Sequence, residues 1–214
     1  MVATVHEALD ELGPVDASTG GTASAVVECE RAIRRLEALK LTLLAAADSA
    51  RIAESSGHSS TGAWLASQTR GGQARCAREV RLAAALTDGL SATTRALADG
   101  TVSSEHASVI ADATSKLPAG LSPAHVATVE QRLVEKAHRF DPVQLRRVAR
   151  RALESVEQDV ATVDAHEDRL LQDEEDPPAA GPGSRSTTTA TAPPAATSQS
   201  PHWPRPCSAR SSTR

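Results

Sequence analysis

The sequence predicts an all-α protein: a multi-helix bundle of about six or seven helices with a long first helix. Apolar residues recur at three- and four-residue intervals, as on one face of a helix. Helix-start pairs such as Ser122-Pro123 and Asp141-Pro142 punctuate that pattern. Aromatic residues make up only 1% of the 214 residues and Tyr is absent, so Ala and Leu must fill the core, as suits closely packed helices.

Composition divides the chain into three parts. Residues 1–22 form a leader in which a turn or two of helix is followed by the breaks Gly13-Pro14 and Gly20-Gly21. Residues 23–176 are predicted to be the helical domain. Residues 177–214 contain no Leu, Ile, Val, Phe or Met and consist largely of Pro, Ala, Ser, Thr and Arg, so we expect a disordered tail.

The long first helix is expected over residues 24–55, ending at Gly57 in the left-handed conformation. Its apolar residues recur nearly every 3.5 positions, with Lys40 as the exception, and form one stripe. The stripe consists of Cys29, Ile33, Leu36, Leu43, Ala47 and Ala50. Two readings follow. The stripe either packs into the bundle core or pairs with a second copy as a coiled-coil dimerisation helix, which would make the protein a homo-oligomer.

Four short helices are predicted between Gly57 and Pro118, each bounded by Gly or Pro. The first follows a Ser59 or Ser60 cap and carries Trp64, which we expect to anchor the core. The others span about residues 73–88, 92–99 and 103–117. For the second of them, the expected inward residues are Ala77, Val80, Ala84 and Leu86.

Two arginine clusters are the candidate binding residues. Arg75 and Arg78 lie on one predicted helix, and Arg146, Arg147, Arg150 and Arg151 lie on another that starts at Asp141-Pro142. Arginines on one helix face can contact the phosphates of a DNA backbone, in a salt-dependent manner. The alternative is a solvated face balanced by Glu79, Glu154 and Glu157.

No catalytic, cofactor-binding or metal-ligating constellation follows from the residue spacing. The three cysteines are isolated, the seven histidines are scattered, and no glycine-rich phosphate loop is present. No basic region precedes an apolar run at the N-terminus, so we expect a cytoplasmic protein without membrane partners. The net charge is −4, and residues 177–214 carry four Arg without any acid, which leaves −8 on residues 1–176. That balance argues against a generally basic nucleic-acid binder.

The order and spacing of several short motifs are similar to those of a known family. The chain resembles the actinobacterial domain of unknown function, family 222, which precedes HNH endonuclease domains and is called the thirteen-E-twelve repeat family in mycobacteria. The motifs are A-W-L at 63–65, A-L-A-D-G at 96–100, V-S-S-E-H-A at 102–107 and D-P-x-x-L-R-R-x-A-R-R at 141–151. The resemblance implies an accessory domain. The HNH module would supply a metal-bound nuclease site, and no residues matching it occur here.

The composition of the tail suggests a frameshift. If the true frame begins one base earlier, codons beginning with T, which include those for Trp and Cys and most of those for Ser, become apolar residues. In residues 184–214 these positions fall first at strand and then at helix spacing. We therefore expect a longer protein truncated near Asp176. A stop codon in the shifted frame soon after codon 214 would contradict this.

Overall fold

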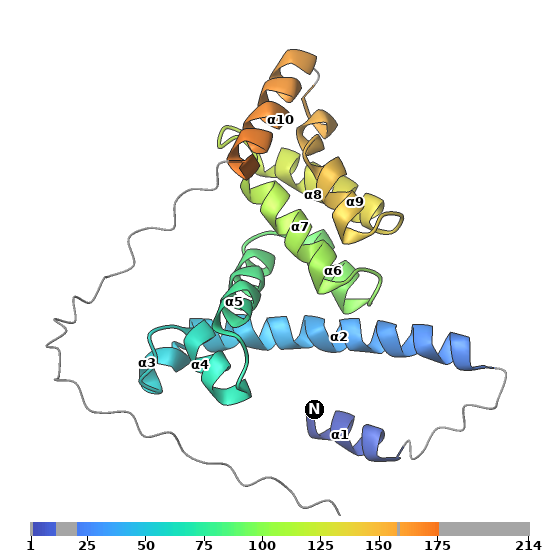
Figure 1. Cartoon of the computed structure of the whole chain (residues 1–214), viewed down its shortest axis with the longest axis vertical. Helices are drawn as coiled ribbons and strands as arrows, with labels where there is room; N and C mark the ends of the chain where they lie inside the picture. The colour runs from blue at the N-terminus through green and yellow to red at the C-terminus, as the bar shows by residue number, and fades with distance from the viewer. Residues whose placement is uncertain (1, 12–20, 158, 176–214) are drawn as a thin grey trace, which may run out of the picture. The chain divides into compact units, whose positions relative to one another are not determined.

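A computed structural model describes residues 2–11, 21–157 and 159–175 (Figure 1). These residues form helices and no strand, so the all-α prediction is confirmed. The leader forms a longer helix than expected. The elements are α1 (Val2–Glu11), α2 (Thr22–Ser49), α3 (Ile52–Ser55), α4 (Thr61–Thr69), α5 (Gln73–Thr87), α6 (Ser91–Ala98), α7 (Ser104–Ser115), α8 (Pro123–Ala137), α9 (Pro142–Ala149), the 3₁₀ turn η1 (Ala152–Ser155) and α10 (Val160–Glu175). The predictions for residues 177–214 fall outside the described residues.

The predicted helix starts are confirmed by capping hydrogen bonds. The hydroxyls of Ser60, Ser103 and Ser122 each accept a hydrogen bond from the backbone N–H three residues on. Asp141 Oδ1 accepts from two backbone N–H groups at 2.8 Å. Such caps satisfy donors that a helix leaves without intrahelical partners, which is why they can be recognised from the sequence.

The expectation of one helix over residues 24–55 is wrong, because the chain breaks after α2. Arg51 adopts the left-handed conformation with φ of 52°, and the short helix α3 starts just after it. Nearby, the hydroxyl of Thr61 donates to the carboxylate of Asp48 at 2.5 Å and ties the end of α2 to the start of α4. No Gly or Pro marks this break. Gly57, at φ of 72°, ends the second piece as expected.

The face of α2 that packs into the bundle is also not the apolar stripe, which was one of the two alternatives that the sequence left open. Leu41 and Leu44 are the buried residues of α2. In contrast, Ile33, Leu36 and Leu43 are between 41% and 49% exposed. The predicted stripe is therefore not the core face, since Leu41 and Leu44 point to a neighbouring side of the helix.

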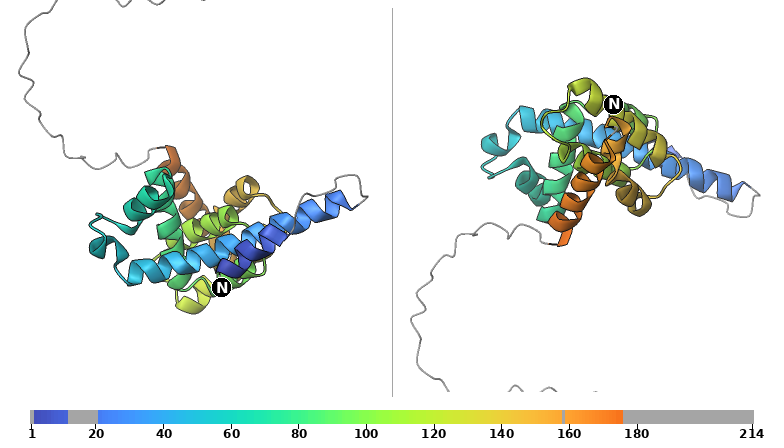
Figure 2. Two further views of the ribbon diagram at one scale, coloured as in Figure 1. Left: turned by 90° about the horizontal axis from the view of Figure 1, so that it is seen from below. Right: turned by 90° about the horizontal axis from the view of Figure 1, so that it is seen from above.

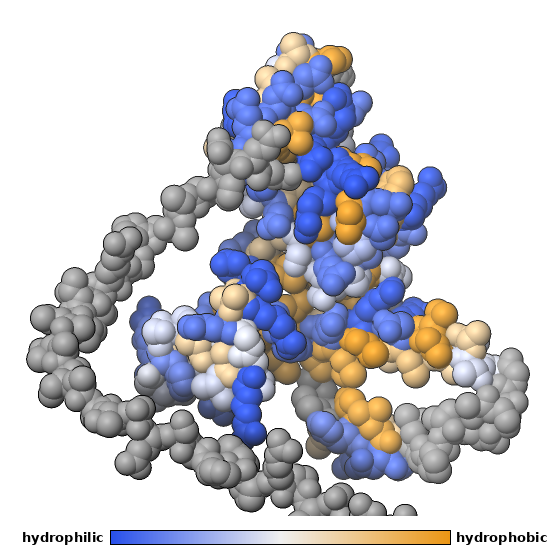
Figure 3. Space-filling view, viewed as in Figure 1, coloured by the Kyte–Doolittle hydropathy of each residue, from blue (hydrophilic) through white to orange (hydrophobic). Residues whose placement is uncertain are grey.

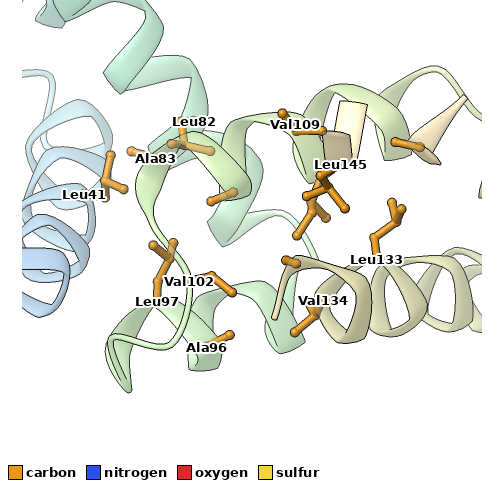
Figure 4. Close-up of a cluster of buried hydrophobic side chains, with 14 of the residues drawn as sticks. Leu41, Leu82, Ala83, Ala96, Leu97, Val102, Val109, Leu133, Val134 and Leu145 are labelled. Atoms are coloured by element: carbon orange, nitrogen blue, oxygen red, sulfur yellow. The ribbon is translucent and has the colours of Figure 1, made fainter. Parts of the chain in front are cut away.

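The core is built mainly from Leu, Val and Ala of α2 and α4–α9, as Figure 4 shows for Leu41, Leu97, Val109, Leu133 and Leu145. Trp64 is partly buried against it, in line with its expected role as an anchor. On α5 the expected inward residues are wrong in part, because Ala84 is exposed. The buried residues of α5 are Cys76, Leu82 and Ala83.

Helix pairs pack closely where small residues allow it. The pairs α4–α5 and α2–α5 have extensive contacts in the N-terminal half, and α7–α9, α6–α8 and α7–α8 in the C-terminal half. An added Cβ at Gly62 on α4 would lie 3.0 Å from the Cα of Ala77 on α5. Glycine at this position therefore sets the distance between the two helices.

Glu130 of α8 is a charged residue in the core, only 1% exposed. Its Oε1 accepts hydrogen bonds from the backbone N–H of Thr93 at 2.7 Å and from the Thr93 hydroxyl at 2.8 Å. Thr93 lies in the first turn of α6, whose own N-cap residue, Leu90, has no side-chain acceptor. Glu130 therefore caps α6 from another helix.

Candidate nucleic-acid interface

The four arginines at and after α9 are in different environments. Arg151 donates to Glu167 at 2.7 Å, to Asp164 at 3.0 Å and to Glu154 at 3.4 Å. Hydrogen bonds to these three carboxylates, with Asp164 contributing most, raise the pKa of Arg151. Its charge is therefore compensated, and it links the end of α9 to η1 and α10.

Arg146 and Arg147 on α9 are exposed. Neither lies within ion-pair distance of an acidic side chain in the part of the chain that the structure describes. Both residues thus present positive charge to solvent without an ion-pair partner among the described residues. Such groups can form charge-assisted hydrogen bonds to phosphate oxygens.

Arg146 and Arg150 also line a groove of about 350 Å³ between α7, α9 and α10. Arg150 is half-buried there. Lys116, which ends α7, joins the two arginines in the groove, and Asp112 brings one negative charge to it. Lys116 is a member that sequence reasoning missed, because the fold brings it close from 30 residues upstream. A lone Lys after a helix gives no signal of its own.

Arg75 and Arg78 lie on α5, away from the lining of that groove. Arg75 pairs with Glu79 at 3.1 Å, and the same carboxylate binds Lys40 of α2 at 2.6 Å. Glu79 thus balances part of this cluster, as the solvated-face reading expected. The structure gives the α9 cluster the larger uncompensated charge.

The histidines serve structural roles where the structure describes them in contact. His106 completes the capping box of α7 with Ser103, and its Nε2 lies 3.0 Å from the carbonyl of Phe140. His166 of α10 is buried, and its Nδ1 makes no hydrogen bond. Desolvation, aided by the nearby charge of Arg169, lowers the pKa of His166.

No group of three or more His, Cys, Asp or Glu residues within residues 2–11, 21–157 and 159–175 is arranged to hold a metal ion. Among the same residues, every helix is too short or too polar to cross a lipid bilayer.

Comparison with known protein families places the chain in a class defined by its helical domain. Residues 23–183 match the family described as Domain of unknown function (DUF222). The match covers well over half of the chain, so this protein belongs to that family. No curated protein and no solved structure matches it.

Proposed function

We propose that this protein is the non-catalytic N-terminal helical domain of an actinobacterial, cytoplasmic HNH endonuclease-like protein, and that α9 contacts the DNA backbone. The observation that carries the proposal is the pair Arg146 and Arg147, exposed without a described acidic partner, while their neighbour Arg151 is bound by three carboxylates. Docking of a nuclease domain on the same basic helix is the alternative use of this surface.

The binding expected is weak and independent of sequence. Phosphate contacts by Arg release counterions, so affinity falls steeply with salt. The negative charge of residues 1–176 opposes binding elsewhere on the surface, which confines it to local clusters. Dissociation constants on the order of 10⁻⁴ to 10⁻⁶ M are typical of such contacts.

The test is fluorescence anisotropy with a short random-sequence duplex over a series of salt concentrations. We expect Arg146→Ala plus Arg147→Ala to weaken binding and to lower the slope of log K against log salt by about 1.8, since each lost phosphate contact contributes about 0.9. Metal-dependent cleavage by the chain would overturn the non-catalytic part of the proposal.

A charge-matched control separates a local contact from a general change in net charge. Arg51→Ala plus Arg132→Ala removes the same number of positive charges from exposed i,i+3 pairs with Glu54 and Glu135. We expect this variant to bind like the wild type. Equal weakening by both double variants would mean that α9 is not a specific contact.

A second candidate function, self-association through α2, is favoured by a separate observation. Val26, Ile33, Leu36 and Leu43 are all more than 40% exposed on α2. Figure 3 shows apolar side chains gathered along this helix. Large contiguous patches of exposed apolar surface are rare on soluble monomers and often mark sites of protein interaction. In this reading the protein is a free-standing helical interaction or regulatory protein.

A further inference from the structure

The long helix α2 has three faces with different surroundings. One face enters the core through Leu41 and Leu44 and packs on α5 and α6. A second face lines an apolar groove of about 980 Å³, across which lie Val5, Ala8 and Leu9 of α1. Figure 2 shows α1 alongside α2. The third face carries the exposed Val26, Ile33 and Leu43, and Leu36 lies at its edge, where it also lines the groove.

The third face has the period of a coiled-coil seam. Positions 26, 29, 33, 36, 40, 43, 47 and 50 alternate three- and four-residue steps without a break. This heptad pattern keeps one side of a helix against a partner helix over its length. We define the seam residues as these eight, of which Val26, Ile33, Leu36 and Leu43 are the large exposed aliphatics.

We propose that the seam of α2 binds the same seam of a second copy of this chain in an antiparallel arrangement centred between Arg34 and Arg35. The proposal rests on the self-association suggested above and specifies its orientation and register. In an antiparallel pair related by a two-fold axis, residues at the same level have a constant sum of residue numbers. In this register Val26 therefore lies opposite residue 43 of the partner copy, and Ile33 lies opposite residue 36 of the partner copy.

This register matches the exposed aliphatic residues with each other. All four large aliphatics of one copy lie opposite large aliphatics of the other, which removes the most apolar surface from water. Shifting the register by one heptad places Val26 opposite the small Ala50 and Leu36 opposite Lys40. The matched register is therefore the one that the side chains favour.

The charges favour the same orientation. Lys40 is the one charged residue in the seam, and its Nζ already binds Glu79 at 2.6 Å. An ammonium group has three N–H donors, so it can bind a second carboxylate. In the antiparallel register Lys40 lies opposite Cys29, next to the exposed Glu30 of the other copy. A parallel pair would instead place the two Lys40 side chains at one level, and like charges repel.

The first test measures oligomeric state by light scattering after size exclusion, from about 1 μM to about 200 μM full-length protein. This range is chosen because a contact along one helix is smaller than a standard interface, so we expect a dissociation constant on the order of 10⁻⁶ to 10⁻⁵ M. Ile33→Asp should weaken dimerisation at least about 100-fold, since it places an unpaired charge in the seam. Val27→Asp is the matched control, because Val27 is 65% exposed on the same helix but outside the seam. Its dimerisation should remain unchanged. Circular dichroism confirms that both variants stay helical.

The second test determines the orientation by disulfide cross-linking. In a Cys207→Ser background, Lys40→Cys should give dimers linked from position 29 to position 40 under mild oxidation, because disulfides form only where Cα atoms lie within about 7 Å. Cys76 is 1% exposed and should not react. In the Cys207→Ser protein without the Lys40→Cys change, cross-linking of Cys29 to Cys29 would indicate a parallel pair. Cross-linking of Ala47→Cys to Cys29 would indicate the shifted register.

The outcomes separate this inference from the proposal on which it rests. A monomer at every concentration overturns both the self-association and its register. A dimer that cross-links through Cys29 alone, or through position 47, overturns the antiparallel register and leaves self-association standing. A dimer equally disrupted by Val27→Asp and Ile33→Asp overturns the assignment to the seam. DNA binding by α9 is independent of all three.

Discussion

Glu130 shows how a charged residue is accommodated in a core of Ala, Leu and Val. A buried carboxylate is costly unless hydrogen bonds replace its lost hydration. Here the first turn of α6 supplies two such bonds from Thr93, at the end of the helix where the dipole favours negative charge. Sequence reasoning had no access to Glu130, because its acidic side chain on a predicted helix resembles any surface residue.

We expect Glu130→Gln to lower the free energy of unfolding by about 1–3 kcal/mol, since the amide loses the charge-assisted bonds and places an NH₂ group in the core. Chemical denaturation monitored by circular dichroism measures this. The matched control is Glu135→Gln on the same helix, where Glu135 is 55% exposed. A loss of stability no larger than that of the control would show that Glu130 does not contribute as a cap.

We expect low pH to destabilise the folded protein through His166. Burial lowers its pKa, so the folded state binds a proton at this ring less readily than the unfolded chain does. Because the unfolded chain binds the proton more readily, stability is full above the ordinary histidine pKa of about 6.5 and decreases as the pH falls toward the lower folded pKa. Thermal unfolding at about pH 7.5 and about pH 5.5 measures this decrease.

The matched variant for this prediction is His166→Leu, which preserves an apolar contact and removes the titrating group. We expect the variant to lose less stability than the wild type over the same pH interval. The other histidines are common to both proteins, so the difference between the two pH profiles isolates His166. Parallel profiles would mean that another group causes the acid sensitivity.

At the scale of elements, the sequence predicts where most helices begin but not where every one ends. Ser60, Ser103, Ser122 and Asp141 could be identified because capping depends on a local side-chain acceptor. The break at Arg51 could not, since arginine seldom adopts the left-handed conformation and gives no sequence signal for it. Arg70, which also adopts the left-handed conformation, likewise ends α4 one residue before Gly71.

The contact between α4 and α5 gives the element-scale prediction. Gly62→Ala should lower the free energy of unfolding by roughly 1–3 kcal/mol, because its new Cβ would lie 3.0 Å from the Ala77 backbone, which cannot move without separating the helices. Gly120→Ala is the control, since nothing lies within 4 Å of its added Cβ and its φ is not in the left-handed region. It should be neutral or slightly stabilising. Urea denaturation of both variants decides, and equal effects would contradict the packing argument.

At the scale of the whole molecule, periodicity predicted the class of fold but not which face of each helix the bundle would bury. On α2 the most regular apolar stripe is exposed, and the core uses the neighbouring Leu41 and Leu44. On α5 the core uses Cys76, Leu82 and Ala83. Ala-rich helices have apolar residues on several sides, so the choice depends on neighbours that only the assembled fold provides.

The candidate interface shows the same limit. The sequence identifies six arginines by their clustering, but the available charge of Arg151 depends on acidic residues of α10 that lie 13 and 16 positions away. Arg151 is compensated by Asp164 and Glu167 of α10, and Glu79 binds Arg75 together with Lys40 of α2. Only Arg146 and Arg147 of the α9 cluster remain exposed without a described acidic partner. Local charge counting cannot make this distinction.

The cap that α8 supplies to α6 has a consequence for how the chain folds. Isolated helices of eight residues are unstable in water, and α6 has no side-chain acceptor at its own start. Its first turn is completed by Glu130, which lies 37 positions beyond Thr93. Helix α6 therefore gains its full stability only after α8 has docked. Its amide protons should exchange through the same cooperative opening as those of α8, rather than by independent fraying.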